Sequence, residues 1–261
     1  MKRTRVTVSP ESFPQPLRGL LQGTAVYDSS CSPEARVFYL ERDGGYYLKK
    51  ASKGTLQQEA ELGRYFHQKG LSPAVLEYLS AEEDWLLTAR AGGEDCTHAE
   101  YLKNPTRLCD LLAELLRKLH ETDAGGCPVP HRTADYFATV DRRFAAGVFD
   151  VSYLPERLRH LSARDAWRIV DEARGALRQD VLLHGDYCLP NIMLQDWRFS
   201  AFIDLGSGGV GDRHIDLYWG IWTLQFNLGT AAYTDRFLDA YGRDGVQPEL
   251  LDVIGAAECF G

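Results

Sequence analysis

The residues best suited to chemistry lie in the octapeptide HGDYCLPN, residues 184–191, and in the Asp-Leu-Gly that begins at Asp204. Asp186 is followed five positions later by Asn191, and Asp204 comes just beyond a short hairpin that is expected after Asn191. Transfer of a phosphoryl group to an alcohol needs a carboxylate beside the acceptor hydroxyl, and hard oxygen ligands for Mg²⁺. The pattern therefore predicts that Asp186 accepts or orients the hydroxyl proton, and that Asn191 and Asp204 are the metal ligands.

Three other residues in or near these motifs are not expected to take part in the chemistry directly. We expect His184 to brace the loop by hydrogen bonding rather than to do chemistry. Asp216, on the helix expected after the second motif, is predicted to support the same loop. Cys188 lies inside the octapeptide, but nothing in the sequence marks its thiol as a nucleophile.

A lysine and a glutamate far upstream complete a phosphate-binding set. Strand alternation places Tyr47 and Lys49 on one face, where a ring and an ammonium group suit an adenine and its phosphates. Glu59 lies near the apolar side of a helix expected at 56–69, where an unpaired carboxylate would be costly, so Lys49 is its natural partner. Glu61 is the competing acid, but its helical phase points toward solvent. The alternatives are an amphipathic surface strand and a solvated helix face.

The loop 29–33, Ser-Ser-Cys-Ser-Pro, follows the first expected strand of this region. Its backbone N–H groups and hydroxyls suit a nucleotide cap, although it has no GxGxxG pattern.

The elements that must position these residues fall into two parts. Before the turn Ala91-Gly92-Gly93 we expect one helix among strands at 23–28, 36–41, 45–50, 74–80 and 84–89. After it the chain becomes helical, beginning with a leucine stripe over 108–119. Further helices are expected at 133–147, 162–179, 212–226, 230–241 and 248–260, and short strands at 181–183, 192–195 and 199–203. Strands followed by helices predict an α+β fold with two lobes and a cleft between them, divided as 1–91 for nucleotide binding and 92–261 for catalysis and substrate binding.

Composition narrows the class of protein. The chain has 261 residues, of which 44% are hydrophobic and 25% charged, as is typical of a globular protein with a sizeable core. The net charge of −8 argues against nucleic acid as a default partner and tolerates a cationic ligand; the alternative is ordinary acidic solubility. The six cysteines have no metal-binding spacing and are expected to be reduced. The N-terminus lacks a signal-like apolar region, so we expect a cytoplasmic protein with no membrane span.

The motifs resemble those of the aminoglycoside phosphotransferases, specifically the 3′-phosphotransferase (kanamycin kinase) branch. HGDYCLPNIM, RFSAFIDLG, GDRHIDLYWGIW, DRFLDAYG and the C-terminal Glu-Cys-Phe carry the resemblance, which runs from about Gly23 to the end. It implies a protein-kinase-like fold with a small β-rich N-lobe and a larger, mostly helical C-lobe. It also implies ATP, or GTP, and Mg²⁺ as cofactors, a cationic aminoglycoside as substrate, and a monomer or weak dimer.

Carried over by position, the resemblance implies a catalytic Asp186, the metal ligands Asn191 and Asp204, and the phosphate-binding pair of Lys49 and Glu59. The other nucleotide contacts that it implies are the adenine-stacking ring, the loop serine and the backbone hinge: Tyr47, Ser32, Thr88, Ala89 and Ala91.

Substrate recognition is where the chain departs from the family pattern. A polycation calls for carboxylates, and the resemblance implies contacts from the insert and the C-terminus: Asp150, Glu156, Glu258 and Phe260. Ala257 stands where acids are usual, Ser207 where Arg is frequent, and Gly261 displaces the terminal carboxylate from the preceding residue.

The leading interpretation is an ATP- and Mg²⁺-dependent kinase that phosphorylates the 3′-hydroxyl of kanamycin-type aminoglycosides and confers resistance. One alternative is a kinase of the same fold that acts on another small amino sugar or metabolite alcohol. The other is a catalytically weak nucleotide-binding module.

Overall fold

The computed structural model describes residues 3–261 and divides into two compact units. The first unit runs to Asp95 and also includes Pro190–Gly206; the second comprises Cys96–Leu189 and Ser207–Gly261. Among the described residues, none of the helices is long and apolar enough to cross a bilayer. The assignment of nucleotide binding to 1–91 and of catalysis to 92–261 stays a prediction.

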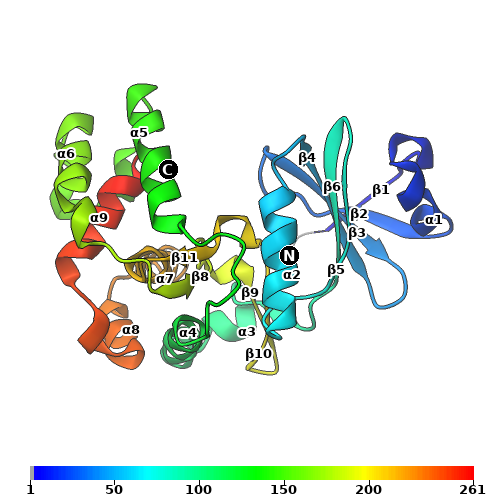
Figure 1. The fold of residues 1–261 in the computed structure, drawn as a ribbon. Coiled ribbons are helices and arrows are strands. Elements are labelled where there is room, and N and C mark those ends of the chain that lie inside the picture. Colours follow the sequence, from blue (N-terminus) through cyan, green and yellow to red (C-terminus); the bar gives the residue numbers. More distant parts are fainter. Residues whose placement is uncertain (1–2) are drawn as a thin grey trace. The chain divides into compact units, whose positions relative to one another are not determined.

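A six-stranded antiparallel sheet is the frame of the first unit. Its order is β1-β2-β3-β4-β6-β5, with β1 at Thr4–Val6, β2 at Ala25–Asp28, β3 at Ala35–Glu41, β4 at Tyr46–Ser52, β5 at Val75–Ser80 and β6 at Glu83–Ala89. Helices α1 (Arg18–Leu21) and α2 (Gln57–Gln68) lie on opposite faces of this sheet (Figure 1). The α1 side buries Leu21 and Trp85 in one apolar cluster, and the α2 side buries Ala60 and Leu86 in another. Alternation along β6 therefore supplies both cores.

The segment Pro190–Gly206 adds a small sheet to the same unit, in which β9 (Ile192–Gln195) lies between β10 (Arg198–Phe202) and β7 (Glu94–Asp95). Strands β9 and β10 are joined by the two residues Asp196 and Trp197, whose φ angles of 52° and 63° are those of a type I′ hairpin turn. At the open end of this hairpin, the Ile203 N–H donates to the Asn191 carbonyl at 3.0 Å. The hairpin thus brings the Asn191 and Asp204 segments together.

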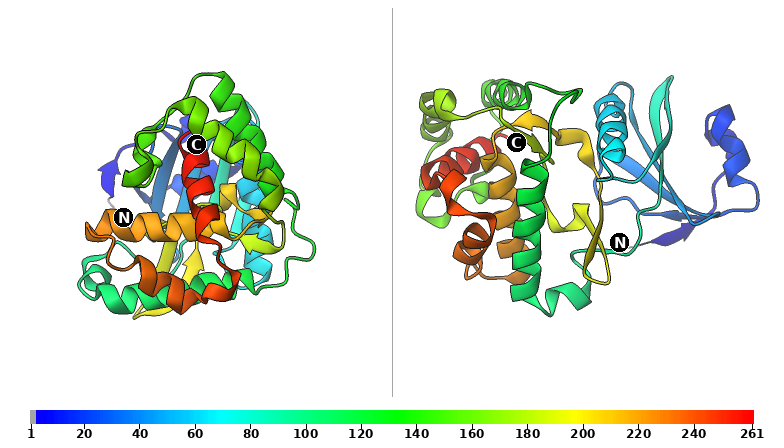
Figure 2. Two further views of the ribbon diagram at one scale, coloured as in Figure 1. Left: turned by 90° about the vertical axis from the view of Figure 1, so that its left-hand side faces the viewer. Right: turned by 60° about the horizontal axis from the view of Figure 1, so that its bottom comes forward.

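The second unit is mainly helical. Its elements are α3 (Ala99–Leu102), α4 (Pro105–His120), α5 (Arg132–Ala145), α6 (Ala163–Ala173), α7 (His214–Leu228), α8 (Thr234–Tyr241) and α9 (Pro248–Glu258), with the two short strands β8 (Val181–Leu183) and β11 (Gly209–Gly211). The leucine stripe of α4 is buried, and α4 lies against α7 and α8 (Figure 2). The other helices of the unit enclose a core that contains Val140, Val170, Ile254 and Phe260.

Two expected helices are shorter in the structure: one ends earlier and the other begins later than predicted. The helix expected at 162–179 stops at Ala173 and continues as a 3₁₀ turn, in which Arg174 bonds to Asp141. The helix expected from 230 begins at Thr234, because the Thr230 hydroxyl accepts the Ala232 N–H and forms a local turn instead.

Candidate active site

A lysine between two carboxylates is the central feature of the first unit. The Lys49 Nζ lies 2.8 Å from Glu59 Oε2 and 3.1 Å from Asp204 Oδ1. Burial acts to lower the pKa of Lys49, but the negative charges of Asp204 and Glu59 outweigh it and raise that pKa, so the ammonium group persists. Burial raises the pKa of Glu59, and the charge of Lys49 opposes this. The predicted pairing of Lys49 with Glu59 is present, while Glu61 is exposed.

Asp204 has a left-handed backbone conformation. Its φ of 55° lies in a region that costs most non-glycine residues roughly 1–2 kcal/mol, although Asp and Asn adopt it more readily than other types. The conformation is held from both sides, by the β9–β10 hairpin and by the Gln58 side chain, whose amide donates to the Gly206 carbonyl at 2.7 Å. Strain of this kind concentrates at functional positions, where surrounding contacts fix it.

A cavity of about 240 Å³ opens beside this lysine, wholly within the first unit. Its lining includes every residue predicted for nucleotide and metal binding: Ser32, Tyr47, Lys49, Glu59, Thr88, Ala89, Ala91, Asn191 and Asp204. Apolar walls come from Val37, Leu86 and Met193. An apolar slot with charges at one end suits a flat base that carries phosphates.

Sequence reasoning missed Arg3, which also lines this cavity. Its Nη2 donates to the Tyr47 hydroxyl at 2.7 Å, and its guanidinium lies 3.7 Å above the Tyr39 ring. Tyr39 and Tyr47 are themselves in contact, with centroids 5.3 Å apart. This cluster depends on the pairing of β1 with β2, which brings the N-terminal segment to the cavity. The pairing of these two strands is not visible in the sequence alone.

The donors predicted for Mg²⁺ fit that ion. Asn191 and Asp204 both line the cavity, and as metal ligands they would bind through side-chain oxygen atoms. Mg²⁺ commonly takes one or two such protein ligands together with substrate phosphates and water. Within residues 3–261, no set of three or more His, Cys, Asp and Glu side chains is placed to hold a metal ion by itself. Asn191 and Asp204 would therefore hold the ion together with a ligand's phosphates and water.

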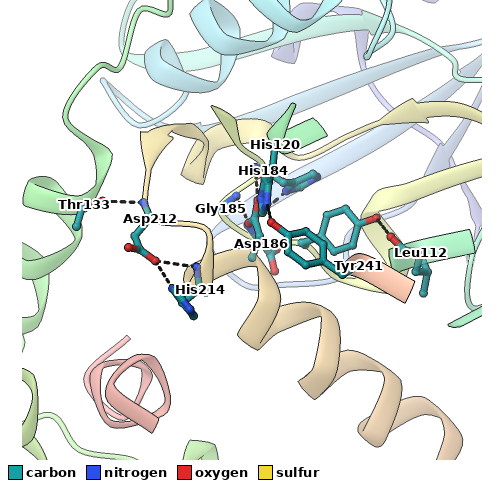
Figure 3. A network of polar contacts seen from close by, with 11 residues as sticks. Leu112, His120, Thr133, His184, Gly185, Asp186, Asp212, His214 and Tyr241 are labelled. Atoms are coloured by element: carbon teal, nitrogen blue, oxygen red, sulfur yellow. Dashed lines mark hydrogen bonds and ion pairs between the residues drawn. The ribbon is translucent and has the colours of Figure 1, made fainter. Parts of the chain in front are cut away.

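The loop that carries His184, Gly185 and Asp186 (Figure 3) belongs to the second unit, and Asp216 holds it by two hydrogen bonds. The fully buried Asp216 carboxylate accepts the His184 N–H at 2.8 Å and the Gly185 N–H at 2.7 Å. The His184 Nδ1 in turn accepts the Asp186 N–H at 3.3 Å. Both bracing contacts predicted for this loop are therefore present, and Asp186 is left half-buried.

The glycine of the octapeptide is required by space and by backbone conformation. Gly185 has a φ of 82°, and a Cβ atom at this position would lie 1.8 Å from the Ser207 carbonyl oxygen. The same carbonyl accepts the Arg132 Nε–H at 2.6 Å. A guanidinium therefore reaches this segment from α5, although residue 207 itself is not Arg.

Sequence reasoning did not find the side chains that extend this support. The His120 Nε2 lies 3.3 Å from the Asp216 carboxylate, and its Nδ1 lies 2.8 Å from the Tyr241 hydroxyl. A second buried pair lies nearby, in which His214 Nδ1 is 2.7 Å from Asp212 Oδ1 (Figure 3). These contacts connect α4, α7 and α8 to the base of the loop.

Two acids lie close to Tyr153 in the second unit. Asp150 precedes Tyr153 by three residues. Glu258 accepts a hydrogen bond from Trp219, whose ring meets that of Tyr153 with centroids 5.9 Å apart. Burial, and after it the charges of nearby acids, raises the pKa of Tyr153. The Glu258 Oε1 accepts the Tyr136 hydroxyl at 2.8 Å and the Trp219 indole N–H at 3.0 Å. Burial nevertheless raises the pKa of Glu258 to about 7, against the effect of these two hydrogen bonds. Acids collected in this way suit a cationic ligand.

Two of the residues expected to bind substrate differ in their exposure to solvent. Glu156 is exposed on a 3₁₀ turn. Phe260 has no exposed surface: its ring packs in the core against Phe144 and Phe149, with centroids 5.7 and 5.5 Å away. The Phe260 side chain therefore has a packing role here, because the core of the unit closes around it. The carbonyl of the following Gly261 accepts a hydrogen bond from Arg143.

A half-buried lysine–glutamate pair, with an aspartate and an asparagine in the same cavity, is the arrangement of kinase-like phosphotransferases, and fold and site together place the molecule in this class. The family model described as "Phosphotransferase enzyme family" matches residues 33–251. A probable aminoglycoside 3′-phosphotransferase of Lactococcus lactis subsp. lactis is 44% identical over all of this chain and 99% of its own. The aminoglycoside 3′-phosphotransferase of Niallia circulans is 29% identical over 75% of this chain and 74% of its own.

Solved structures agree with this classification. An aminoglycoside 3′-phosphotransferase of type VIII has a TM-score of 0.80 and 26% identity, over 95% of this chain and 97% of its own. An aminoglycoside phosphotransferase of Streptomyces rimosus, solved with ADP and streptomycin, has the same fold, with a TM-score of 0.71 and 24% identity over 86% and 90% of the two chains. The chain belongs to the aminoglycoside 3′-phosphotransferase branch of the phosphotransferase enzyme family. It is an enzyme that transfers a phosphoryl group to an alcohol, and the predicted kinase-like α+β fold is confirmed.

Proposed function

We propose that this enzyme transfers the γ-phosphoryl group of ATP, in the presence of Mg²⁺, to the 3′-hydroxyl of kanamycin-type aminoglycosides and thereby confers resistance. The observation that carries the proposal is Lys49, held between Glu59 and Asp204 at one end of a cavity with apolar walls. The 44% identity with the Lactococcus lactis relative, which spans the whole chain, supports the acceptor and its position.

In this proposal the first unit binds the nucleotide. Tyr47 stacks on the adenine, the backbone of Thr88–Ala91 contacts the edge of the base, and Ser32 contacts the phosphates from its loop. Lys49 binds phosphate oxygens and is oriented by Glu59. Asn191 and Asp204 would hold Mg²⁺, and the ion would supply positive charge beside the phosphates. Most of the catalytic effect is positioning and electrostatic stabilisation, because little covalent chemistry falls to the protein.

The second unit binds and orients the acceptor. Asp186 accepts or orients the proton of the attacking hydroxyl, and its loop stays in place because Asp216 holds two backbone N–H groups. Asp150 and Glu258 attract the ammonium groups of the amino sugar, and the exposed Glu156 adds to this attraction from farther out. The carboxylates around Tyr153 support a polycationic acceptor over a neutral sugar.

A matched pair of variants tests the reaction. Purified protein with ATP and Mg²⁺ should phosphorylate an aminoglycoside that has a 3′-hydroxyl and spare a 3′-deoxy analogue. Asp186→Asn keeps the size of the side chain but removes the carboxylate, and should reduce kcat by about 10²-fold or more. The same change at the exposed Asp196, in the β9–β10 turn, is the control and should leave turnover unchanged.

Two results would count against the proposal. Phosphorylation of the 3′-deoxy compound at the same rate would contradict the position of transfer. Turnover of neutral sugars or other alcohols, but of no aminoglycoside, would favour a kinase of the same fold with another acceptor. Replacing ATP by GTP in the same assay measures the nucleotide preference.

A further inference from the structure

Three aromatic side chains line one face of helix α7. Trp219, Trp222 and Phe226 are spaced at i, i+3 and i+7, which places them in one row. Trp219 and Trp222 meet edge to face, with centroids 5.4 Å apart. Trp222 and Phe226 are stacked, with centroids 5.0 Å apart and planes 8° from parallel. Tyr153, from the segment before α6, stacks on Trp222 at 6.0 Å.

The outer end of this aromatic row is open to solvent. Phe226 is 71% exposed, the highest value among the three large apolar side chains that are exposed within residues 3–261. A single exposed apolar residue is ordinary, but a stacked series that continues from the core to the surface is a contiguous apolar patch. Such patches commonly bind a ligand or another molecule.

The inner end of the row meets the acids of the acceptor site. The Trp219 indole N–H donates to Glu258 at 3.0 Å, and the Tyr153 ring meets the Trp219 ring edge to face, with centroids 5.9 Å apart. On the same helix, directly after Trp222, the Thr223 hydroxyl accepts the backbone N–H of Leu189, in the octapeptide, at 3.1 Å. The row therefore starts beside the loop that carries Asp186 and leads away from it.

We propose that Tyr153, Trp222 and Phe226 form a stacking surface for the rings of an amino-sugar substrate that lie beyond the ring being phosphorylated. The inference rests on the proposed function and extends it to the size of the substrate. The charge of the surrounding groups indicates which ligand would bind. The carboxylates beside Trp219 favour a ligand with ammonium groups, and ammonium groups also bind over aromatic faces. From Trp219 to Phe226 the helix rises about 10 Å, enough for more than one sugar ring.

The test compares two aminoglycosides that share the reacting ring, one with two rings and one with additional outer rings. Trp222→Ala and Phe226→Ala should each raise the KM for the longer substrate relative to the shorter one, by about two- to fivefold per ring removed. The values of kcat should change much less than KM. Val148→Ala removes part of another exposed apolar side chain of the same unit and should leave the KM ratio at the wild-type value.

A binding measurement separates stacking from a general loss of structure. Tryptophan fluorescence should change when the longer substrate is added to nucleotide-free protein, and Trp222→Phe should reduce this change while retaining binding. An unchanged KM ratio in both alanine variants overturns the inference, as does an equal rise for the two substrates. A dimer that dissociates on Phe226→Ala would instead assign the surface to self-association. Absence of turnover with either substrate by the unaltered enzyme refutes the proposed function, and the inference with it.

Discussion

Replacement of Glu258 by glutamine should stabilise the protein at alkaline pH, although Glu258 is a proposed substrate-binding residue. Its carboxyl group is buried, and burial raises its pKa to about 7 from a usual 4.5. Glutamine retains an oxygen that can accept from Tyr136 and Trp219 but never becomes charged. The substitution therefore removes the cost of a buried charge and keeps the two hydrogen bonds.

The sign and size of the effect follow from proton binding. Glu258 holds its proton more tightly in the folded protein than in the unfolded chain, so its stabilising contribution is complete below about pH 4.5 and is lost as the pH rises through 7. A pKa of about 7 instead of 4.5 corresponds to roughly 3 kcal/mol, at about 1.4 kcal/mol per pH unit. Between pH 5 and pH 8, the wild type should lose about 2–3 kcal/mol of unfolding free energy relative to Glu258→Gln.

The assay is urea unfolding of both proteins at several pH values, with the difference in unfolding free energy plotted against pH. Glu249→Gln, at an exposed acid of the same helix α9, is the control and should show no such change. A saturating cationic substrate should reduce the difference at pH 8, because it stabilises the charged carboxylate. A difference that stays constant from pH 5 to pH 8 would refute the reasoning, since it would mean that the carboxyl group does not titrate in this range.

Three further substitutions test the supports of the site. Asp216→Asn keeps one acceptor oxygen and loses one charge-assisted hydrogen bond. Steady-state kinetics should therefore show a lower kcat with an unchanged nucleotide KM. Urea unfolding should show a free energy of unfolding that is lower by about 1.5–3 kcal/mol. Gly185→Ala should abolish activity because its Cβ atom meets a backbone oxygen, whereas Gly126→Ala, at a similar φ of 75° but in open space, should retain it. Glu59→Gln leaves Lys49 without its nearest carboxylate and should weaken ADP binding about tenfold by calorimetry; unchanged affinity would contradict the orienting role.

The parts of the site that local sequence patterns determine could be predicted. Strand alternation placed Tyr47 and Lys49 on one face, and helical phase brought Glu59 to the same lysine, because both rules act over a few residues. The turn between β9 and β10 could be expected from the spacing of Asn191 and Asp204. The three-residue strand β8 could be recognised as a continuous apolar run, but β1 and β11 were missed, because each has the same length and only one apolar residue other than glycine.

Other parts depend on partners that are distant in the sequence. His120 and Tyr241 each end an amphipathic helix, and only the packing of α4 against α8 reveals that they meet. Arg3 reaches Tyr47 through the pairing of a terminal strand. For Phe260, the resemblance implied a substrate contact, but the aromatic side chains of neighbouring segments bury its ring. No local pattern contains this information.

Three residues in the proposed binding regions have a conformation or an environment that is unfavourable by itself. Asp204 has a left-handed backbone, Glu258 is a buried acid with a raised pKa, and Phe226 is an aromatic side chain left in water. Each opposes folding or solubility on its own, and local rules of this kind are usually broken only where function requires it. Substitutions at these positions should therefore behave unlike substitutions in the core: Glu258→Gln should gain stability and weaken substrate binding, and Phe226→Ala should leave stability almost unchanged while weakening long substrates. A loss of stability comparable to that of a truncated core residue, about 3–5 kcal/mol for an aromatic ring, would instead assign the residue to the packing of its unit.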